Sequence, residues 1–289
     1  MKMLVTGATG KLGMKVVKIL LKTVPAEQLA VSVRNPEKAE GLRALGVEVR
    51  KGDFDLPETL DSAFAGIERL LLISADGDNE TRIPQHRNAV AAAERAGVKF
   101  IAYTSLAKAK ESQNFLAPTH QATEEAILKS GISYSFLRNN WYLENEISSI
   151  QGVLAGAPWV TSAGNGKVGW ALQEEYAEAA AAVLSGHGHD NTIYELSGKL
   201  LTQEEIATAL GSILGQEVPV SQVDDHTYAD IMKGAGVPDF LIPMLVGIQK
   251  GIRKENLEVE SNDFEKLLGR PLTPIKEGLT QIVNEISTK

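Results

Sequence analysis

The sequence predicts an α/β fold built on a doubly wound parallel sheet. Two observations lead to this prediction: short runs of β-branched and aliphatic residues alternate with longer segments of helical period, and the short runs are apolar throughout. Strands that are apolar on both faces are typical of parallel sheets covered by helices on both sides. Right-handed crossovers would bring the loops after successive strands to one edge of the sheet, where such folds bind ligands.

The same alternation predicts the individual elements. We expect strands over residues 3–6, 29–33, 47–51, 69–73, 100–104 and 132–137, and helices over 11–22, 83–96 and 118–129. After residue 152 glycine and proline become frequent, and helices dominate from residue 202. We therefore expect a sheet domain over 1–152 and mainly a small helical lid over 153–289. A helix over 174–185 and a strand over 192–196 are expected to pack back on the sheet domain, and 228–252 to form a helical cap.

Composition argues against several classes of partner and chemistry. With 289 residues, 43% of them hydrophobic, and a net charge of −8, the chain can bury a large core and would repel a phosphate backbone, so nucleic acid is not an expected partner. The absence of cysteine excludes disulfides and thiolate chemistry and fits a reducing cytoplasm, our expected location. No apolar run approaches the roughly 20 residues that span a bilayer, and no charged leader precedes the first strand, so neither a membrane nor secretion is expected.

The most informative motif follows the first strand directly and opens the first helix. It reads Gly7-Ala8-Thr9-Gly10-Lys11-Leu12-Gly13. Glycine is needed where the backbone turns tightly beside a pyrophosphate, and the helix start points free N–H groups at that anion. We therefore expect a dinucleotide cofactor held by Gly7, Thr9, Gly10, Lys11, Leu12 and Gly13. The alternative is a tight strand-to-helix turn that uses glycine for its own geometry.

The end of the second strand predicts which dinucleotide binds. Sites specific for NAD usually present a carboxylate to the ribose 2′-hydroxyl there, whereas this chain has Arg34. A guanidinium suits a 2′-phosphate, and Lys11 could add a second positive charge. We expect NADPH, with NADH bound more weakly. The alternative is that Arg34 is a solvated loop residue.

Further cofactor contacts are expected where the third and fourth strands end. Asp53 and Phe54 could bracket the adenine, and Ser74 and Ala75 would lie along the cofactor. The alternative for the acidic pair is structural: Asp53 and Asp55 would turn the chain and cap the helix that starts near Pro57.

Three segments resemble a known family, the NmrA-like atypical short-chain dehydrogenases: residues 7–13, Val33-Arg34-Asn35-Pro36 and Gly52-Asp53-Phe54-Asp55. Two further segments, His120-Gln121-Ala122-Thr123-Glu124 and Leu137-Arg138-Asn139-Asn140-Trp141-Tyr142-Leu143-Glu144-Asn145, are similar to its bacterial NAD(P)H:quinone oxidoreductase 2 subgroup. The likeness continues to Gly269-Arg270-Pro271 and so covers almost the whole chain.

The resemblance implies a Rossmann domain with a small C-terminal lid, and a cleft between them that holds NADPH and a small-molecule quinone. It places Ser105 near the nicotinamide and His120 where the classical short-chain enzymes have a tyrosine. We interpret His120 as a proton donor or as the partner of the quinone oxygen. Asn140, Trp141 and Tyr142 would line the reacting end. The alternatives are a helix-start role for His120 and plain core packing for Trp141 and Tyr142.

One departure from the wider superfamily bears on mechanism. Typical short-chain dehydrogenases protonate a carbonyl with a tyrosine whose partner lysine follows four residues later, and none of the 6 tyrosines here has a lysine at that spacing. Quinones accept hydride readily and need little acid assistance, so direct hydride transfer guided by positioning is expected. The alternatives are a non-catalytic NAD(P)-binding redox sensor of the NmrA type and another reductase or isomerase of this fold.

Several remaining polar groups are expected to be structural. His187-Gly188-His189 has no third ligand in register, so no metal is expected. The pairs Glu124-Glu125 and Glu174-Glu175 are interpreted as exposed helix charges, and Asp224-Asp225 as a helix start. A homodimer is left open.

Overall fold

A seven-stranded parallel sheet forms the large unit of the protein, in a computed structural model that describes residues 1–288. Its strand order is β10-β6-β5-β4-β1-β2-β3, and every neighbouring pair is parallel. The strands are β1 (Met3–Thr6), β2 (Leu29–Val33), β3 (Glu48–Lys51), β4 (Arg69–Leu72), β5 (Phe100–Leu106), β6 (Ser133–Asn139) and β10 (Thr192–Leu196). The predicted fold class is confirmed.

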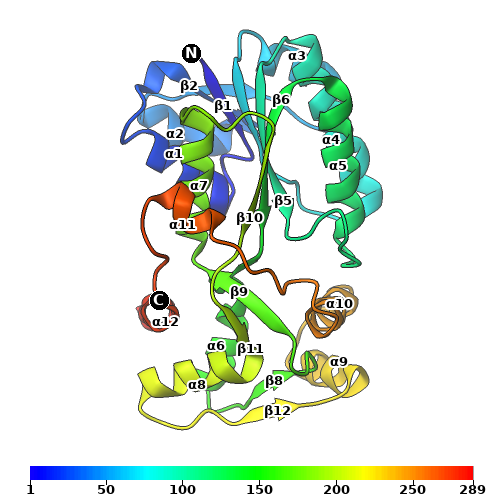
Figure 1. The fold of residues 1–289 in the computed structure, drawn as a ribbon, viewed down its shortest axis with the longest axis vertical. Coiled ribbons are helices and arrows are strands. Elements are labelled where there is room, and N and C mark those ends of the chain that lie inside the picture. The colour runs from blue at the N-terminus through cyan, green and yellow to red at the C-terminus, as the bar shows by residue number, and fades with distance from the viewer. Residues whose placement is uncertain (289) are drawn as a thin grey trace.

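Helices cover both faces of this sheet (Figure 1). One face carries α1 (Lys11–Leu20) and α7 (Gln173–Ser185), and the other carries α3 (Pro57–Phe64), α4 (Asn79–Arg95) and α5 (Ala117–Ser130). Alternate residues of one strand therefore enter different cores: Val5 packs on the α1 side and Leu4 on the α4 side. This double burial explains the continuous apolar strands of the sequence. Between β2 and β3 lie only a 3-10 turn (Pro36–Ala39) and the short α2 (Glu40–Ala44).

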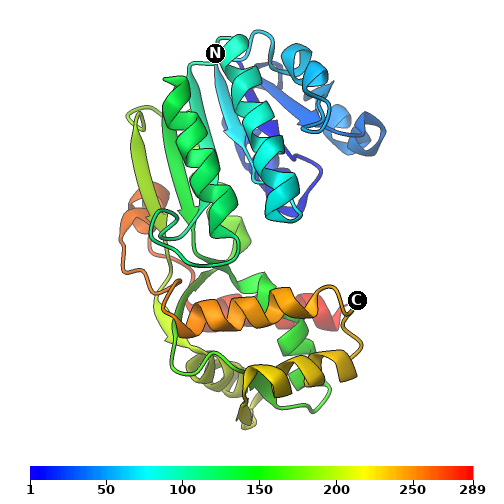
Figure 2. The same cartoon turned by 90° about the vertical axis from the view of Figure 1, so that its right-hand side faces the viewer.

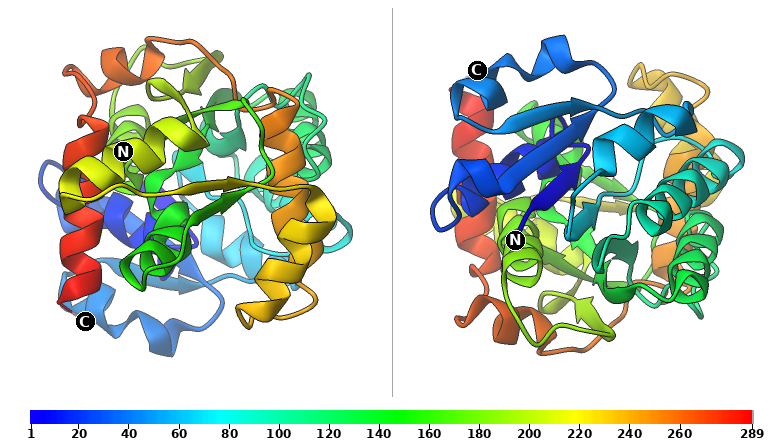
Figure 3. Two further views of the ribbon diagram at one scale, coloured as in Figure 1. Left: turned by 90° about the horizontal axis from the view of Figure 1, so that it is seen from below. Right: turned by 90° about the horizontal axis from the view of Figure 1, so that it is seen from above.

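The remaining elements form a smaller unit, here called the lid, below the sheet in Figure 1. It has two small sheets, ordered β11-β9-β7 and β12-β8. The strands are β7 (Trp141–Tyr142), β8 (Trp159–Thr161), β9 (Lys167–Ala171), β11 (Leu200–Thr202) and β12 (Val220–Gln222); the helices are α6 (Ile147–Leu154), α8 (Gln203–Leu214), α9 (Asp225–Gly234), α10 (Ile242–Arg253) and α12 (Ile275–Ser287). Figure 2 shows α10 crossing below α4 and α5, and Figure 3 shows α10 and α12 on opposite sides of the lid.

The chain passes between the two units more than once. It leaves the large sheet after Asn139, earlier than the boundary expected at residue 152, and returns through α7 and β10, which pairs with β6. Near the C-terminus, α11 (Asp263–Leu268) packs on α7 and β10. The division into a cofactor domain and a substrate lid stays a prediction.

The helical cap expected over residues 228–252 consists of two helices. Helix α9 ends at Gly234 and α10 begins at Ile242. Gly236 has a φ of +83°, and Pro238 follows it, so neither residue continues an α-helix. Asp224 caps α9 through the Thr227 N–H at 2.8 Å, as the sequence predicts.

A buried ion pair joins α5 to the end of β6. Arg138 donates to both carboxylate oxygens of Glu124, at 2.8 and 3.0 Å, and also to Glu195 at 3.1 Å. The expectation that Glu124 is an exposed helix charge was therefore wrong, and so was the same expectation for Glu175, which accepts from Arg270 at 3.1 Å. Neighbouring Glu125 is exposed, as expected, and Glu174 is half-buried.

Replacing Glu124 should destabilise the fold. The substitution Glu124→Gln leaves the Arg138 guanidinium buried with half of its carboxylate partners, so we expect a loss of about 3 kcal/mol in the free energy of unfolding. Urea denaturation followed by circular dichroism measures it. The matched control is Glu125→Gln on the exposed side of the same helix, which should cost less than about 0.5 kcal/mol. Equal stability of the two variants would contradict the expectation.

Candidate functional site

The glycine turn brings the start of α1 against the end of β1. Gly7 has a φ of +60°, its carbonyl accepts the Gly10 N–H at 2.9 Å, and the helix begins at Lys11. A Cβ on Gly13 would lie 2.4 Å from the Gly7 carbonyl oxygen, so only glycine permits this approach. No side chain caps α1, and Thr9, Gly10 and Lys11 are exposed. The first-turn N–H groups therefore form an open cradle that fits a diphosphate.

Arg34 stands directly after β2 on the same edge of the sheet. Its side chain is exposed and forms no ion pair within residues 1–288. The next residue, Asn35, accepts the Glu37 N–H at 3.0 Å and so begins a 3-10 turn that directs the chain away. Arg34 and the exposed Lys11 thus leave two positive charges available beside the glycine turn.

At the end of β3, the side chains of Asp53 and Phe54 have different surroundings. Asp53 accepts the Asp55 N–H at 3.0 Å, which makes the turn that the sequence predicts. It does not cap α3, whose N-cap is Leu56 without a side-chain bond. The half-buried Phe54 ring lies edge-on to His86, with ring centroids 6.3 Å apart. Their contact with adenine stays a prediction.

The loop after β4 is held by side chains from three other elements. The backbone N–H of Ser74 donates to Thr104 Oγ1 at 2.9 Å, and that of Ala75 donates to His86 Nε2 at 3.0 Å. Ile73 N–H donates to Thr6 Oγ1 at 2.9 Å. These hydrogen bonds fix the shape of the loop at the edge of the sheet, and Ser74 and Ala75 are both half-buried there.

Behind that loop lies a cluster of buried polar rings. Because His86 Nε2 accepts from Ala75, its proton is on Nδ1, which donates to Thr123 Oγ1 at 2.8 Å. Tyr103 Oη lies 2.9 Å from His120 Nδ1. Burial, reinforced by the charge of Arg82, lowers the pKa of His86 to about 3 and that of His120 well below its usual range. Both rings are neutral at physiological pH.

His120 meets Arg82 through its other ring nitrogen, with Arg82 Nη2 at 3.3 Å from Nε2. A guanidinium can only donate, so Nε2 accepts and the ring proton is on Nδ1, facing Tyr103. His120 is 6% exposed, and both of its nitrogens have partners inside the protein. Its predicted role as a proton donor therefore requires Arg82 to leave Nε2, and it stays a prediction.

Arg82 is a residue of this cluster that sequence reasoning missed. It lies on α4 with His86, Ala89 and Ala93, which are all buried. That spacing of one or two turns places Arg82 on the buried face of the helix and could have revealed it. A charged residue on an apolar face is uncommon enough to mark a site.

The predicted residues near the ends of β5 and β6 form hydrogen bonds within the protein. Ser105 Oγ donates to Glu124 at 2.6 Å and is buried. The Tyr142 hydroxyl accepts from Asn139 Nδ2 at 3.1 Å, and burial raises the pKa of Tyr142 to about 12. Asn139 Oδ1 is buried without a partner. Asn139 was not singled out from the sequence, although it adjoins the predicted Asn140.

Asn140 and Trp141 are engaged in holding the lid. Asn140 Nδ2 donates to Ser197 Oγ at 3.0 Å and to the Leu257 carbonyl at 2.8 Å. Trp141 Nε1 donates at 3.1 Å to the buried carboxylate of Glu146, whose pKa is raised by burial. These two side chains thus join β7 to the surrounding lid.

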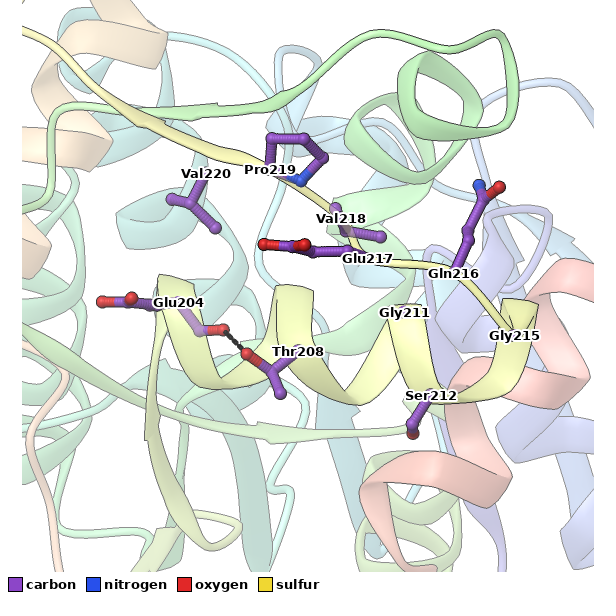
Figure 4. Close-up of a pocket in the computed structure, with 10 residues that line it drawn as sticks. All are labelled: Glu204, Thr208, Gly211, Ser212, Gly215, Gln216, Glu217, Val218, Pro219 and Val220. Atoms are coloured by element: carbon purple, nitrogen blue, oxygen red, sulfur yellow. Dashed lines mark hydrogen bonds between the residues drawn. The ribbon is translucent and has the colours of Figure 1, made fainter.

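Other features of the molecule lie away from this edge. Within residues 1–288 no group of acidic residues or histidines could hold a metal ion, and His189 Nδ1 lies 2.8 Å from Tyr194 Oη. An open groove of about 600 Å³ separates α8 from the segment leading into β12 (Figure 4), and it shares no residue with the predicted site. Among the residues that the structure describes, no helix is both long and apolar enough to cross a bilayer.

The parallel sheet, the glycine turn and the cation after β2 together define a dinucleotide-binding protein of the Rossmann type. The chain belongs to the NmrA-like family, whose profile matches residues 1–263.

Three relatives show how far the similarity extends. Quinone oxidoreductase 2 of Escherichia coli (strain K12) is 42% identical over 281 residues, 97% of this chain and 98% of the relative. The structure of Citrobacter sp. triphenylmethane reductase complexed with NADP(H) matches with a TM-score of 0.93 at 42% identity, over 98% of this chain and 100% of that one. The structure of the NADPH-dependent quinone oxidoreductase from Escherichia coli complexed with NADPH matches with a TM-score of 0.93 at 41% identity, over 97% and 99%. The predicted resemblance is confirmed.

Adding a methyl group at Gly13 should remove the diphosphate cradle. The substitution Gly13→Ala forces the α1 backbone away from Gly7, so we expect a loss of about 2 kcal/mol of stability together with loss of NADPH binding. Calorimetric titration and thermal unfolding measure the two effects. In the control Gly41→Ala, the new Cβ on α2 meets nothing within 4 Å. That variant should bind NADPH normally and be as stable as the wild type or more so, by up to about 1 kcal/mol.

Proposed function

We propose that this protein is an NADPH-dependent reductase that transfers hydride to a quinone or a similar electrophilic small molecule. The single observation that carries the proposal is the open helix start with an unpaired guanidinium beside it. Relatives at 42% and 41% identity form complexes with NADP(H) and NADPH, which supports this cofactor. The relatives' names supply the acceptor class, a quinone in one case and a triphenylmethane dye in another.

The residues present fit the cofactor. The first-turn N–H groups of α1 would hold the diphosphate, and Arg34, assisted by Lys11, would hold the 2′-phosphate. Asp53 and Phe54 would lie at the adenine, Ser74 and Ala75 along the dinucleotide, and Ser105 near the nicotinamide. Bound there, NADPH supplies the hydride. The unpartnered Oδ1 of Asn139 is an acceptor placed at the same edge of the sheet.

The chain's own contribution is positioning rather than acid catalysis by a Tyr-Lys pair. Ser74 and Ala75 are fixed through their backbone donors, so the surface against which the reactants lie needs little rearrangement. Tyr142, half-buried and held by Asn139, would form an apolar wall of the reacting end with Trp141. His120 would act there as the partner of Arg82, and Asn140 would keep the lid in place beside it.

Rapid mixing of the purified protein with NADPH and a simple benzoquinone tests the function. We expect the absorbance of the reduced nicotinamide to fall in a saturable, protein-dependent reaction, because the positioned reactants need no further catalyst. Protein inactivated by Gly13→Ala provides the background rate. Binding of NADPH without consumption above that background would instead favour a non-catalytic redox sensor.

Removing the guanidinium should change coenzyme preference. In Arg34→Ala the 2′-phosphate loses a charged donor worth about 1.5–3 kcal/mol, so we expect NADPH to bind roughly 10- to 100-fold more weakly while NADH changes little. Calorimetric titration with both coenzymes measures this. Arg87→Ala, an exposed arginine on α4, is the control for overall charge and should bind both as the wild type does. An equal loss for NADPH and NADH would refute the assignment.

A further inference from the structure

Arg82 is a buried cation that forms no ion pair with a carboxylate. Arg82 is 4% exposed, and within residues 1–288 it forms no salt bridge. Its Nε atom is buried and has no hydrogen-bond partner. Burial lowers the pKa of Arg82, opposed by the Tyr103 phenol and the exposed Asp76 carboxylate. A buried charge without a counter-ion costs several kcal/mol, so its retention calls for a reason.

The other interior arginine shows what a structural role looks like in this fold. Arg138, at the end of β6, is paired with both oxygens of Glu124 and with Glu195. Arg82 instead contacts two neutral groups, Ser74 Oγ at 2.6 Å and His120 Nε2 at 3.3 Å. Its positive charge is therefore not neutralised inside the protein and acts on whatever lies at Ser74.

Ser74 is placed to pass that charge outward. Its backbone N–H donates to Thr104, and its Oγ accepts the short bond from Arg82. The hydroxyl proton can therefore be donated to a ligand, for which the neighbouring Tyr103 phenol is the competing acceptor. The residue is half-buried just beyond the end of β4, at the edge where the cofactor cradle lies. A hydroxyl polarised by a guanidinium is a stronger donor than an ordinary serine.

We propose that Ser74, positioned and polarised by Arg82, donates a hydrogen bond to the acceptor oxygen that becomes negative during reduction. The inference rests on the proposed reductase function and deepens it by assigning an oxyanion site. Ser74 is the group that touches the substrate, and Arg82 is a positioning residue that acts through it. His120 keeps Arg82 in place by accepting its second N–H.

The charge balance of the reaction explains why such a site is needed. A quinone that accepts a hydride gains one hydrogen and two electrons, so one carbonyl oxygen becomes a phenolate until a proton from water completes the hydroquinone. Donors aimed at an oxygen that gains charge lower the barrier, and they do so most in a site shielded from water. A cationic triphenylmethane dye that accepts the same hydride at its central carbon becomes neutral, and no oxyanion forms.

The two acceptors therefore separate an oxyanion site from a merely structural one. For Arg82→Met and for Ser74→Ala we expect kcat with a benzoquinone to fall on the order of 100-fold. The ratio of kcat with the quinone to kcat with a cationic triphenylmethane dye should fall roughly tenfold or more in both variants, because no negative charge develops on the dye, whereas loss of a cofactor contact would lower both rates alike. Since Arg82 acts through Ser74, the double variant should be no slower with the quinone than the slower single variant. Arg82→Lys should restore part of the quinone rate, and Arg87→Met on the same helix should match the wild type.

A second readout does not depend on turnover. With oxidised dinucleotide bound, 4-nitrophenol should occupy the acceptor site of the wild type with its pKa lowered, seen as a larger phenolate absorbance at a given pH. Arg82→Met and Ser74→Ala should bring that pKa back toward its value in water. The oxyanion assignment is overturned by equal losses with quinone and dye, by an unchanged quinone rate, or by an unchanged phenolate fraction in the variants. Consumption of NADPH by the wild type in the same experiments tests the reductase function separately.

Discussion

The close approach of α1 to the end of β1 is the constraint on which the rest of the site depends. Because Gly13 has no side chain, the helix start can lie against the Gly7 carbonyl, and its first N–H groups face the open edge of the sheet. A diphosphate bound there would direct one end of a dinucleotide toward β2 and Arg34 and the other toward β4, β5 and β6. In that arrangement the strand order, with β1 between β4 and β2, would separate the recognition of the adenosine from the chemistry.

Buried polar groups determine how the reacting end is built. Glu124 ties Ser105 and Arg138 together, and His86 fixes the loop after β4 through a backbone N–H. These contacts are satisfied and rigid, so they shape the site without taking part in the reaction. The buried side-chain atoms that lack partners include Arg82 Nε and Asn139 Oδ1. Rigid surroundings with a few unsatisfied groups are what a preorganised binding site requires.

The parts of the molecule specified by local sequence were predictable, and those specified by distant contacts were not. The glycine turn, the strands of the large sheet and the Asp224 cap depend on neighbouring residues, and the sequence indicated each of them. Glu124 looked like an ordinary helix charge and Arg82 was not singled out, because their partners lie elsewhere in the sequence: Arg138 is on β6, Ser74 follows β4 and His120 is on α5. The break between α9 and α10 had a local signal in Gly236 and Pro238, which the apolar pattern of the segment concealed.

The late return of the chain to the large sheet has a consequence for how the protein is made. Strand β10 completes the sheet and helix α7 covers α1. Both follow four elements of the lid in the sequence, namely β7, α6, β8 and β9. During synthesis the apolar face of α1, including Val16 and Val17, remains uncovered until the ribosome has released residues beyond 185. The nascent chain therefore exposes a hydrophobic stripe for much of translation, the kind of surface that molecular chaperones bind.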